Sequence, residues 1–359
     1  MRVDIPRERL KNQRIDGRPL KRPIDVVRWL VASQAQDFAG AKWALGLRAS
    51  GANDAHVERA FNEGAILRTH LMRPTWHFVT QEDIRWMLAL TAPRVHTVNG
   101  HYYRKLGLDA ATLRKATSTL TRALEGGHEL TRAELRQELA GARIDTEGQR
   151  MAYILMHAEL DAAICSGPRR GKQFTYALID ERAIRARVLS RDDALVELAG
   201  RYFASRGPAT VRDFAKWSGL TIAEARTGLE AAAPKLRRRV VGGATYWSGD
   251  AVARTQRSER CHLLSIYDEY ISSYRDRSAI CEPAYGKRLV GMGNALAYVI
   301  VMDGRIAGTW KRSLSRDTVH IHLTPFRKLG RAEKQAAAAA AERLVRFVGG
   351  EKTLDWQIA

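Results

Sequence analysis

The sequence predicts an α+β protein built from three winged-helix units in a row, followed by a C-terminal α+β module. Three observations lead to this prediction: a helix–helix–helix–hairpin pattern that occurs three times, helix caps and glycine stops between the elements, and arginines that recur at the hairpins. We expect the first unit in residues 1–105, the second in 106–188, the third in 189–255 and the C-terminal module in 256–359.

The first unit opens on an apolar segment with helical spacing. Asn53 is a good N-cap for a later helix, and Gly64 can end that helix. Apolar and polar residues then alternate on both sides of Pro74, which predicts a hairpin. The expected elements are helices 25–36, 38–47, 55–63 and 80–90, and strands 65–71 and 75–79.

The second and third units repeat this plan. Thr131 and Glu134 form a capping box before a short helix, and Thr210 begins the short helix of the third unit. Each unit ends in two alternating segments, which around Gly242-Gly243 predict a tight hairpin. The expected helices are 110–125, 131–139, 149–162, 191–205, one that starts at 210, and 221–233; the expected strands are 164–167, 174–178, 236–241 and 245–247.

The last hundred residues have a different pattern, which predicts a sheet covered by one long helix. Asp303-Gly304 is a strong signal for a two-residue hairpin turn. The strand-like segments are 262–266, 297–302 and 319–323, the helix is expected at 331–348, and residues 354–358 are expected to close the sheet.

The charge of the chain predicts a polyanionic partner. Lys and Arg number 59 and Asp and Glu number 39, which leaves a net charge of +20. Nucleic acid is the commonest polyanion inside a cell, so DNA binding is the first functional expectation. An anionic membrane is the competing polyanion, but no stretch is long and apolar enough to span a bilayer. The N-terminus is charged where a signal peptide needs an apolar core, so we expect a cytoplasmic, nucleoid-associated protein.

Basic residues gather where a winged helix would present its hairpin to DNA. Such a hairpin contacts the phosphate backbone or the adjacent groove, and phosphate contacts supply affinity without sequence choice. For any single cluster, a solvated surface charge is an equally good interpretation. The predicted DNA-binding residues are Arg169, Arg170 and Lys172 in the second unit, Arg237, Arg238 and Arg239 in the third, and Lys311 and Arg312 in the C-terminal module.

The common catalytic signatures are missing from the sequence. It contains no phosphate-binding glycine loop, no serine nucleophile elbow and no His-Glu-x-x-His helix. The three cysteines form no Cys-x-x-Cys pair, and His320 with His322 is a weak signal for a metal, so we expect neither metal nor cofactor. Asp268, Glu269 and Asp276 lie beside arginines, which favours a structural ion-pair network over a catalytic acid and base.

One small polar pair remains. Gln34 and Gln36 follow the first apolar segment, and from spacing alone they are two surface glutamines at a helix end. Three further stretches follow in order, at residues 73–79, 264–277 and 303–310. On these residues the sequence resembles the winged-helix DNA glycosylases related to AlkZ and YcaQ, a family marked by a Gln-x-Gln or Gln-x-Asp pair. The stretches span most of the chain, and their order makes the match specific.

The resemblance implies that the three units form a concave basic surface for duplex DNA. We expect the protein to be a monomer. It implies a monofunctional glycosylase that removes bulky N7-alkylated guanine and unhooks interstrand crosslinks. The Gln-x-Gln form is similar to the branch that protects producers of DNA-alkylating natural products. Gln36 therefore favours self-resistance to such a product over general repair.

The chemistry of this reaction suits two amides. Alkylation at N7 gives the base a positive charge, so the base can leave without a general acid. The protein then has to place a water and to stabilise a sugar with oxocarbenium character. An amide carbonyl can accept from the water and face the cation, while the NH₂ group fixes its orientation. We assign both tasks jointly to Gln34 and Gln36. Because a crosslinked base cannot be fully extruded, we expect an open cleft.

Two other functions fit the same fold and charge. One is a winged-helix transcription regulator, which needs no Gln-x-Gln pair. The other is a non-enzymatic protein that binds and shields damaged DNA. Only the enzyme makes abasic sites, which heating in alkali converts to strand breaks.

Overall fold

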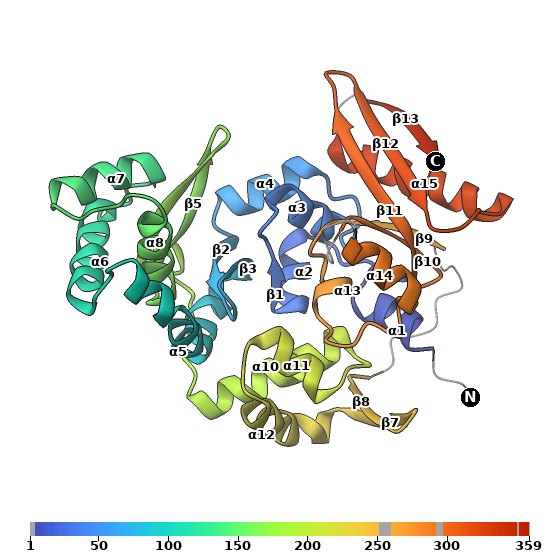
Figure 1. The fold of residues 1–359 in the computed structure, drawn as a ribbon, viewed down its shortest axis with the longest axis horizontal. Helices are drawn as coiled ribbons and strands as arrows, with labels where there is room; N and C mark the ends of the chain where they lie inside the picture. The colour runs from blue at the N-terminus through green and yellow to red at the C-terminus, as the bar shows by residue number, and fades with distance from the viewer. Residues whose placement is uncertain (1–3, 251–259, 292–296, 350–351, 359) are drawn as a thin grey trace.

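The computed structural model describes residues 4–250, 260–291, 297–349 and 352–358. The expected mixed α+β fold is confirmed. Figure 1 shows the three hairpin-ended units in the order of the chain, with the second unit as one arm and the C-terminal sheet as another. The expected boundaries between the units, at residues 105, 188 and 255, stay predictions, and residue 255 lies outside the described residues. No helix in the described ranges is long and apolar enough to cross a membrane.

The first unit orders its elements as helix, strand, helix, helix and hairpin. The short strand β1 pairs with β3, so the sheet order is β1-β3-β2 and all pairs are antiparallel. The Asn53 side chain caps α4, as expected. The elements are α1 (Ile5–Asn12), which precedes the unit, α2 (Pro23–Leu30), β1 (Ala32–Gln34), α3 (Phe38–Gly46), α4 (Asp54–Asn62), β2 (Ile66–Leu71) and β3 (Thr75–Thr80).

The second unit repeats the same order. Its sheet order β4-β6-β5 matches that of the first unit, and the capping box between Thr131 and Glu134 is confirmed. The elements are α5 (Gln81–Lys105), which leads into the unit, α6 (Ala110–Leu124), β4 (Leu130–Thr131), α7 (Arg132–Gly141), α8 (Arg150–Leu160), β5 (Ile164–Arg170), β6 (Gln173–Leu178) and α9 (Ile179–Arg182).

The third unit has a single bridge, Ala209 to Trp247, in the place of the first short strand. The hairpin turns at Gly242-Gly243, as expected, and both glycines have a positive φ. The elements are α10 (Arg191–Arg206), α11 (Val211–Ser218), α12 (Ile222–Ala232), the 3₁₀ turn η1 (Ala233–Lys235), β7 (Arg237–Val241) and β8 (Ala244–Ser248).

The C-terminal module is a five-stranded sheet in the order β13-β12-β11-β10-β9, in which only β12 and β13 run parallel. Asp303 and Gly304 both have a positive φ, which confirms the expected turn. The elements are β9 (Cys261–Leu264), α13 (Glu269–Ser272), α14 (Pro283–Gly291), β10 (Val299–Met302), β11 (Arg305–Leu314), β12 (Thr318–Pro325), α15 (Arg331–Val348) and β13 (Thr353–Ile358).

The prediction of one helix over residues 25–36 is wrong. Helix α2 ends at Leu30, Val31 has a φ of 66°, and the chain continues as β1. The cause is a buried side chain from the third unit. Arg206 donates from Nη1 to the Leu30 carbonyl and from Nη2 to the Ala32 carbonyl, both at 2.8 Å. These two bonds satisfy carbonyls that a continuing helix would have used.

Other elements also differ from the prediction. Helix α5 passes through Pro93 and ends at Lys105 rather than near residue 90. Strand β5 extends through Arg170, so the basic loop shrinks to the two-residue turn Gly171-Lys172. The hairpin turn at Asp303-Gly304 implied a strand after it, but the bounds of the ten-residue strand β11 were not predicted.

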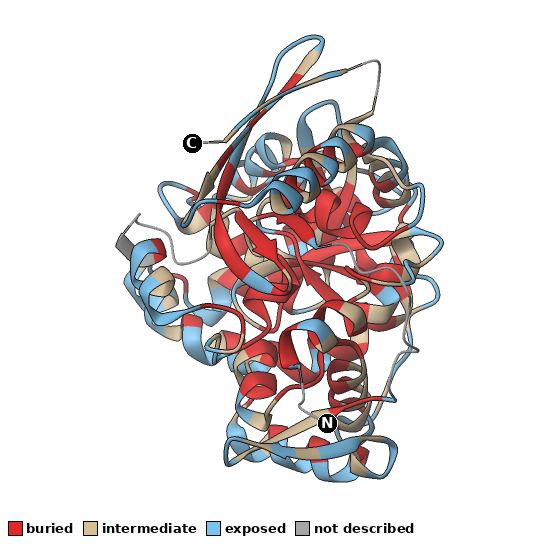
Figure 2. Cartoon of the chain, turned by 90° about the vertical axis from the view of Figure 1, so that its right-hand side faces the viewer, coloured by how far each residue is buried: buried red, intermediate tan, exposed pale blue. Residues whose placement is uncertain are grey.

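Hydrophobic packing ties the first unit to its neighbours. Its side chains share one core with the C-terminal module, including Trp43 and Trp310, and a second core with the third unit, including Trp86 and Trp217. Figure 2 shows the first of these as a continuous buried region that runs from the C-terminal sheet into the N-terminal helices. The second unit has a core of its own. The first unit is therefore the best-supported place in the molecule for a rigid site.

Candidate active site

Gln34 lies at the end of β1, in register with His77 on β3. Directly paired residues of antiparallel strands present their side chains to the same face, so the amide and the imidazole are neighbours. Gln34 is buried, with 8% of its surface exposed. Within the described residues its side-chain amide makes no hydrogen bond, whereas its main-chain N–H donates to Glu269 Oε1 at 2.9 Å.

Glu269 is the anchor of this strand. Its second oxygen, Oε2, accepts from Arg206 Nη2 at 2.8 Å, from Trp217 Nε1 at 2.9 Å and from Ser273 Oγ at 2.6 Å. Burial raises the pKa of Glu269, but the charge of Arg206 and the hydrogen bonds from Ser273 and Arg206 outweigh it and lower the pKa to about 2. The carboxylate is therefore charged at neutral pH and fixes the main chain of Gln34 through one hydrogen bond.

Residues of β2 and β3 fix the main chain directly after Gln34. The N–H of Ala35 donates to the Trp76 carbonyl at 2.7 Å, and the carbonyl of Ala35 accepts from Arg68 Nε at 3.1 Å. The Arg68 guanidinium is buried over the Trp76 ring, at 4.3 Å from its centroid. The backbone between the two glutamines thus has little freedom to shift.

Gln36 is exposed, and its amide orientation is set by the neighbouring strand. Its Oε1 atom accepts from the Trp76 main-chain N–H at 3.3 Å, which turns the NH₂ group away from Trp76. Asp37 is occupied elsewhere: it caps α3 through the N–H of Gly40 and accepts from the Tyr298 hydroxyl. These bonds hold the Asp37 carboxylate away from the two glutamines.

The chain at and just before β3 carries several unpartnered polar atoms, and among them Thr75 and His77 lie on the sheet face of Gln34. The buried atoms without a hydrogen-bond partner in the described part of the chain include Arg73 Nε, Thr75 Oγ1, Trp76 Nε1 and His77 Nε2. Native proteins leave few such atoms, and a run of them marks a place where water or a ligand completes the bonding. The sequence indicated this stretch only through the family resemblance, which gave its side chains no role.

His77 is the most informative of these residues. It is fully buried, and Nδ1 lies 2.9 Å from the Thr75 carbonyl, which fixes Nδ1 as the protonated nitrogen. Burial and the neighbouring Arg73 lower its pKa to about 3. The imidazole is therefore neutral at pH 7, and Nε2 carries a lone pair beside Gln34.

The acidic cluster is structural, as expected, but its partners were predicted wrongly. Asp268 pairs with Arg48 at 2.7 Å and Glu269 with Arg206 at 2.8 Å, rather than with the adjacent arginines. Both pairs are buried and join segments more than 60 residues apart. Sequence spacing carries no signal for such a contact.

The β5/β6 hairpin carries one predicted basic cluster. Arg170 and Lys172 are exposed, and Arg170 pairs with Glu134. Arg169 is mostly buried, pairs with Glu58 at 3.2 Å and lies over the Phe38 ring. Arg170 and Lys172 are thus better placed to meet a ligand than Arg169.

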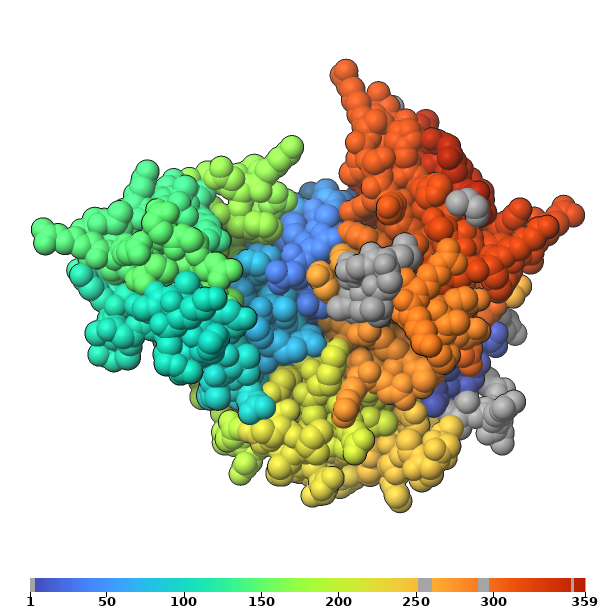
Figure 3. All heavy atoms as spheres, viewed as in Figure 1, coloured from blue at the N-terminus to red at the C-terminus, as the bar shows by residue number. Residues whose placement is uncertain are grey.

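The β11/β12 hairpin carries another cluster. Lys311 is exposed and Arg312 is partly exposed, and neither has an acidic partner within the described ranges. Figure 3 shows a broad hollow between this arm and the arm of the second unit, with the first unit at its floor. Two basic clusters therefore flank the unit that carries Gln34 and Gln36.

The β7/β8 hairpin is placed differently. Figure 1 shows it at the end of the molecule opposite this hollow. Arg237 pairs with Asp250 and Arg239 pairs with Glu8, while Arg238 is exposed. The DNA-binding role of all three clusters stays a prediction, and the geometry favours the first two.

Comparison with known proteins fits this arrangement. A family model described as "DNA glycosylase AlkZ-like" matches residues 27–347. The chain belongs to the AlkZ-like DNA glycosylase family. It is thus a DNA glycosylase, an enzyme that hydrolyses N-glycosyl bonds of DNA, which disfavours the transcription regulator.

Two further comparisons extend along nearly the whole chain. An interstrand DNA cross-link repair glycosylase from Streptomyces sahachiroi is 23% identical over 372 residues, covering 95% of either chain. The solved structure of the DNA glycosylase AlkZ from the same organism superposes with a TM-score of 0.83 at 21% identity, covering 100% of both chains. The chain therefore shares its mixed α+β fold with AlkZ.

The lowered pKa of the buried Glu269 carboxyl predicts that the stability of the protein depends on pH. The pKa of Glu269 is about 2 in the folded protein against an ordinary value of 4.5, so its charge contributes full stability above pH 4.5. This contribution disappears as the pH falls toward 2. At neutral pH we expect Glu269→Gln to lower the free energy of unfolding by about 3–5 kcal/mol, because Arg206 loses its counter-charge.

Urea unfolding followed by tryptophan fluorescence at several pH values measures this difference. The gap between parent and Glu269→Gln should narrow as the pH falls from 4.5 toward 2. Glu230→Gln, which changes an exposed carboxylate on α12, is the matched control and should follow the parent. A gap of the same size at acid and neutral pH would contradict a depressed pKa.

Proposed function

We propose that this DNA glycosylase hydrolyses the N-glycosidic bond of bulky N7-alkylguanine in duplex DNA, with Gln34 and Gln36 as catalytic residues. One observation carries the proposal: Gln34, on an immobilised backbone, shares a sheet face with the unpartnered polar atoms of Thr75 and His77, and Gln36 follows two residues later. Gln36 is exposed, so a bulky adduct can approach without complete extrusion. The residues form a positioning device for water rather than an acid–base pair.

The reaction needs little more than positioning. The bond between N9 of the base and C1′ of the sugar breaks, and its electron pair neutralises the positive charge of the alkylated base. The water oxygen bonds to C1′, and the proton that it loses passes to solvent. The Gln34 carbonyl faces the developing cation, and the amides hold the water by hydrogen bonds. His77 Nε2 adds a neutral acceptor on the same face.

The substrate includes interstrand crosslinks in this proposal. The curated relative is named as an interstrand DNA cross-link repair glycosylase, and both arms of the hollow present basic hairpins that suit a duplex. The Gln-x-Gln pair favours self-resistance to an alkylating natural product. We infer that a monomer acts on chromosomal DNA in the cytoplasm.

Replacement of either glutamine should slow base release without loss of DNA affinity. We expect Gln34→Ala and Gln36→Ala each to lower the single-turnover rate by about 10²-fold, the cost of removing one preorganised group that stabilises developing charge. Heating the incubated duplex in alkali counts the abasic sites, and fluorescence anisotropy gives the affinity. Gln335→Ala, an exposed glutamine on α15, is the matched control.

The outcomes of this experiment separate the candidate functions. If both variants release the base as fast as the parent, the catalytic assignment is wrong. If the parent makes no abasic sites on any alkylated duplex, a protein that only binds or shields DNA is the better account.

The β11/β12 and β7/β8 hairpins should contribute unequally to DNA binding. Lys311→Ala with Arg312→Ala should weaken duplex binding and reduce the slope of log affinity against log salt by about 1 for each phosphate that the variant no longer neutralises. Reversing the charges of Arg237, Arg238 and Arg239 should weaken binding less, because that hairpin lies away from the hollow. A salt titration of affinity measures both.

The control for this comparison removes two charges from α15. Arg331→Ala with Lys334→Ala changes the net charge by the same amount as the β11/β12 variant, at exposed positions. Equal slopes for the β11/β12 variant and this control would exclude the hairpin from the interface.

A further inference from the structure

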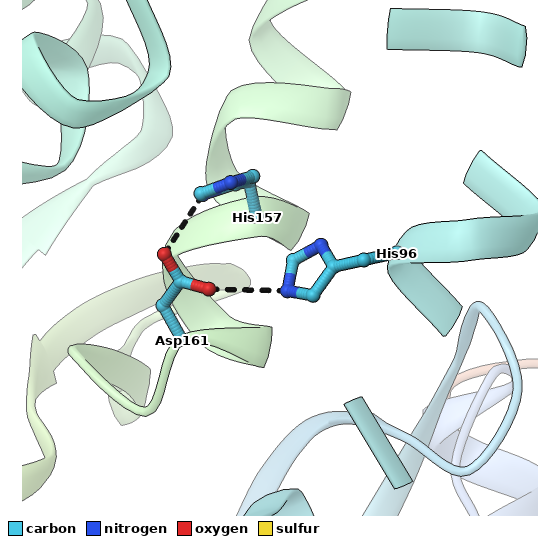
Figure 4. A group of neighbouring side chains, drawn as sticks. All are labelled: His96, His157 and Asp161. Atoms are coloured by element: carbon cyan, nitrogen blue, oxygen red, sulfur yellow. Dashed lines mark ion pairs between the residues drawn. The ribbon is translucent and has the colours of Figure 1, made fainter. Parts of the chain in front are cut away.

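Helix α5, which leads into the second unit, and helix α8 of that unit bring two histidines and an aspartate together. His96 lies on α5, His157 lies near the end of α8, and Asp161 is the C-cap of α8. Figure 4 shows both imidazoles turned toward the Asp161 carboxylate. His96 Nε2 lies 3.0 Å from one carboxylate oxygen and His157 Nδ1 lies 3.2 Å from the other.

The spacing of these groups suits a metal ion. His157 and Asp161 are four residues apart at the end of a helix, so they share one face, and His96 faces them from the second helix. Their three ligand atoms all lie within 4.8 Å of one another. Small rotations of the side chains would place all three at bonding distance from one ion.

One ring nitrogen of His157 lacks a hydrogen-bond partner among the described residues. The Nδ1 atom of His157 is buried and satisfies no hydrogen bond to any described residue, despite its approach to Asp161.

The surroundings complete the site. His96 Nδ1 lies 3.1 Å from the Tyr103 hydroxyl, a contact that orients the ring so that Nε2 faces the Asp161 carboxylate, as the hydrogen-bond partner of a metal-binding histidine does. The C-terminal end of α8 is the negative end of its dipole, which favours a cation. His96 and Asp161 also line a cavity of about 420 Å³ that offers an entry path and room for a water ligand.

We propose that His96, His157 and Asp161 bind one Zn²⁺ ion, with a water from the adjoining cavity as the fourth ligand. Two imidazoles and one carboxylate favour zinc over magnesium or calcium, which prefer oxygen ligands alone. The ion ties α5 to α8 and so fixes the arm of the second unit relative to the first. This site is separate from Gln34 and Gln36, and it stands whether or not the proposed substrate is correct.

Zinc titration of the full, untagged chain tests this site. After treatment with EDTA, isothermal titration calorimetry with ZnCl₂ should give one ion per chain, and zinc should raise the melting temperature. Cobalt substitution should give the visible absorption of a four-coordinate site. His157→Ala should weaken zinc binding by more than about tenfold and abolish the rise in melting temperature, because it removes a direct ligand.

Two further variants keep the result decisive. Asp161→Asn preserves the shape of the side chain and should also weaken zinc binding if His157→Ala fails to fold. His101→Ala, an exposed histidine on the same helix α5, should bind zinc like the parent. Absence of zinc binding by the parent at micromolar concentration, or equal binding by the parent, His157→Ala and Asp161→Asn, would overturn the proposal and leave an ion-pair cluster only.

Discussion

The buried ion pair between Arg206 and Glu269 is the contact on which the candidate active site depends. Arg206 ends α2 by binding the carbonyls of Leu30 and Ala32, and Glu269 fixes Gln34 through the main-chain N–H. A buried ion pair adds little net stability, but breaking it leaves an uncompensated charge. This ion pair instead fixes geometry, because it joins the third unit and the C-terminal module to the short strand β1 of the first unit.

The three units share one order of elements, but only the first unit carries the two glutamines. The first short strand of each unit occupies the same place in its sheet, but it carries Gln34 in the first unit, Thr131 in the second and a single bridge at Ala209 in the third. In the second unit this strand leads directly into a helix capped by Thr131. The first unit is packed on two sides, by the third unit and by the C-terminal module. The proposed catalytic pair therefore lies on the unit whose backbone is packed on two sides, which suits a site that needs fixed geometry.

Local signals in the sequence predicted local structure well. The cap at Asn53 and the turn at Asp303-Gly304 depend on neighbouring residues alone, and both are present. The end of α2 depends on Arg206, which is distant in the sequence, so helical spacing alone extended the helix too far. The pairing of Glu269 with Arg206 and the proximity of His96 to His157 also join residues distant in the sequence, so neither was predicted. Gln34 and Gln36 were found through the family resemblance, since their spacing alone indicated only surface glutamines.

Glu269 should act on the reaction through Gln34, because its carboxylate holds the strand that carries the amide. A double-mutant cycle on single-turnover base release from a duplex with one N7-alkylguanine tests this most directly. We expect Glu269→Gln to slow base release, and Glu269→Gln combined with Gln34→Ala to be about as slow as Gln34→Ala alone. Rate losses that multiply in the double variant would mean that the two residues act independently and would contradict this coupling.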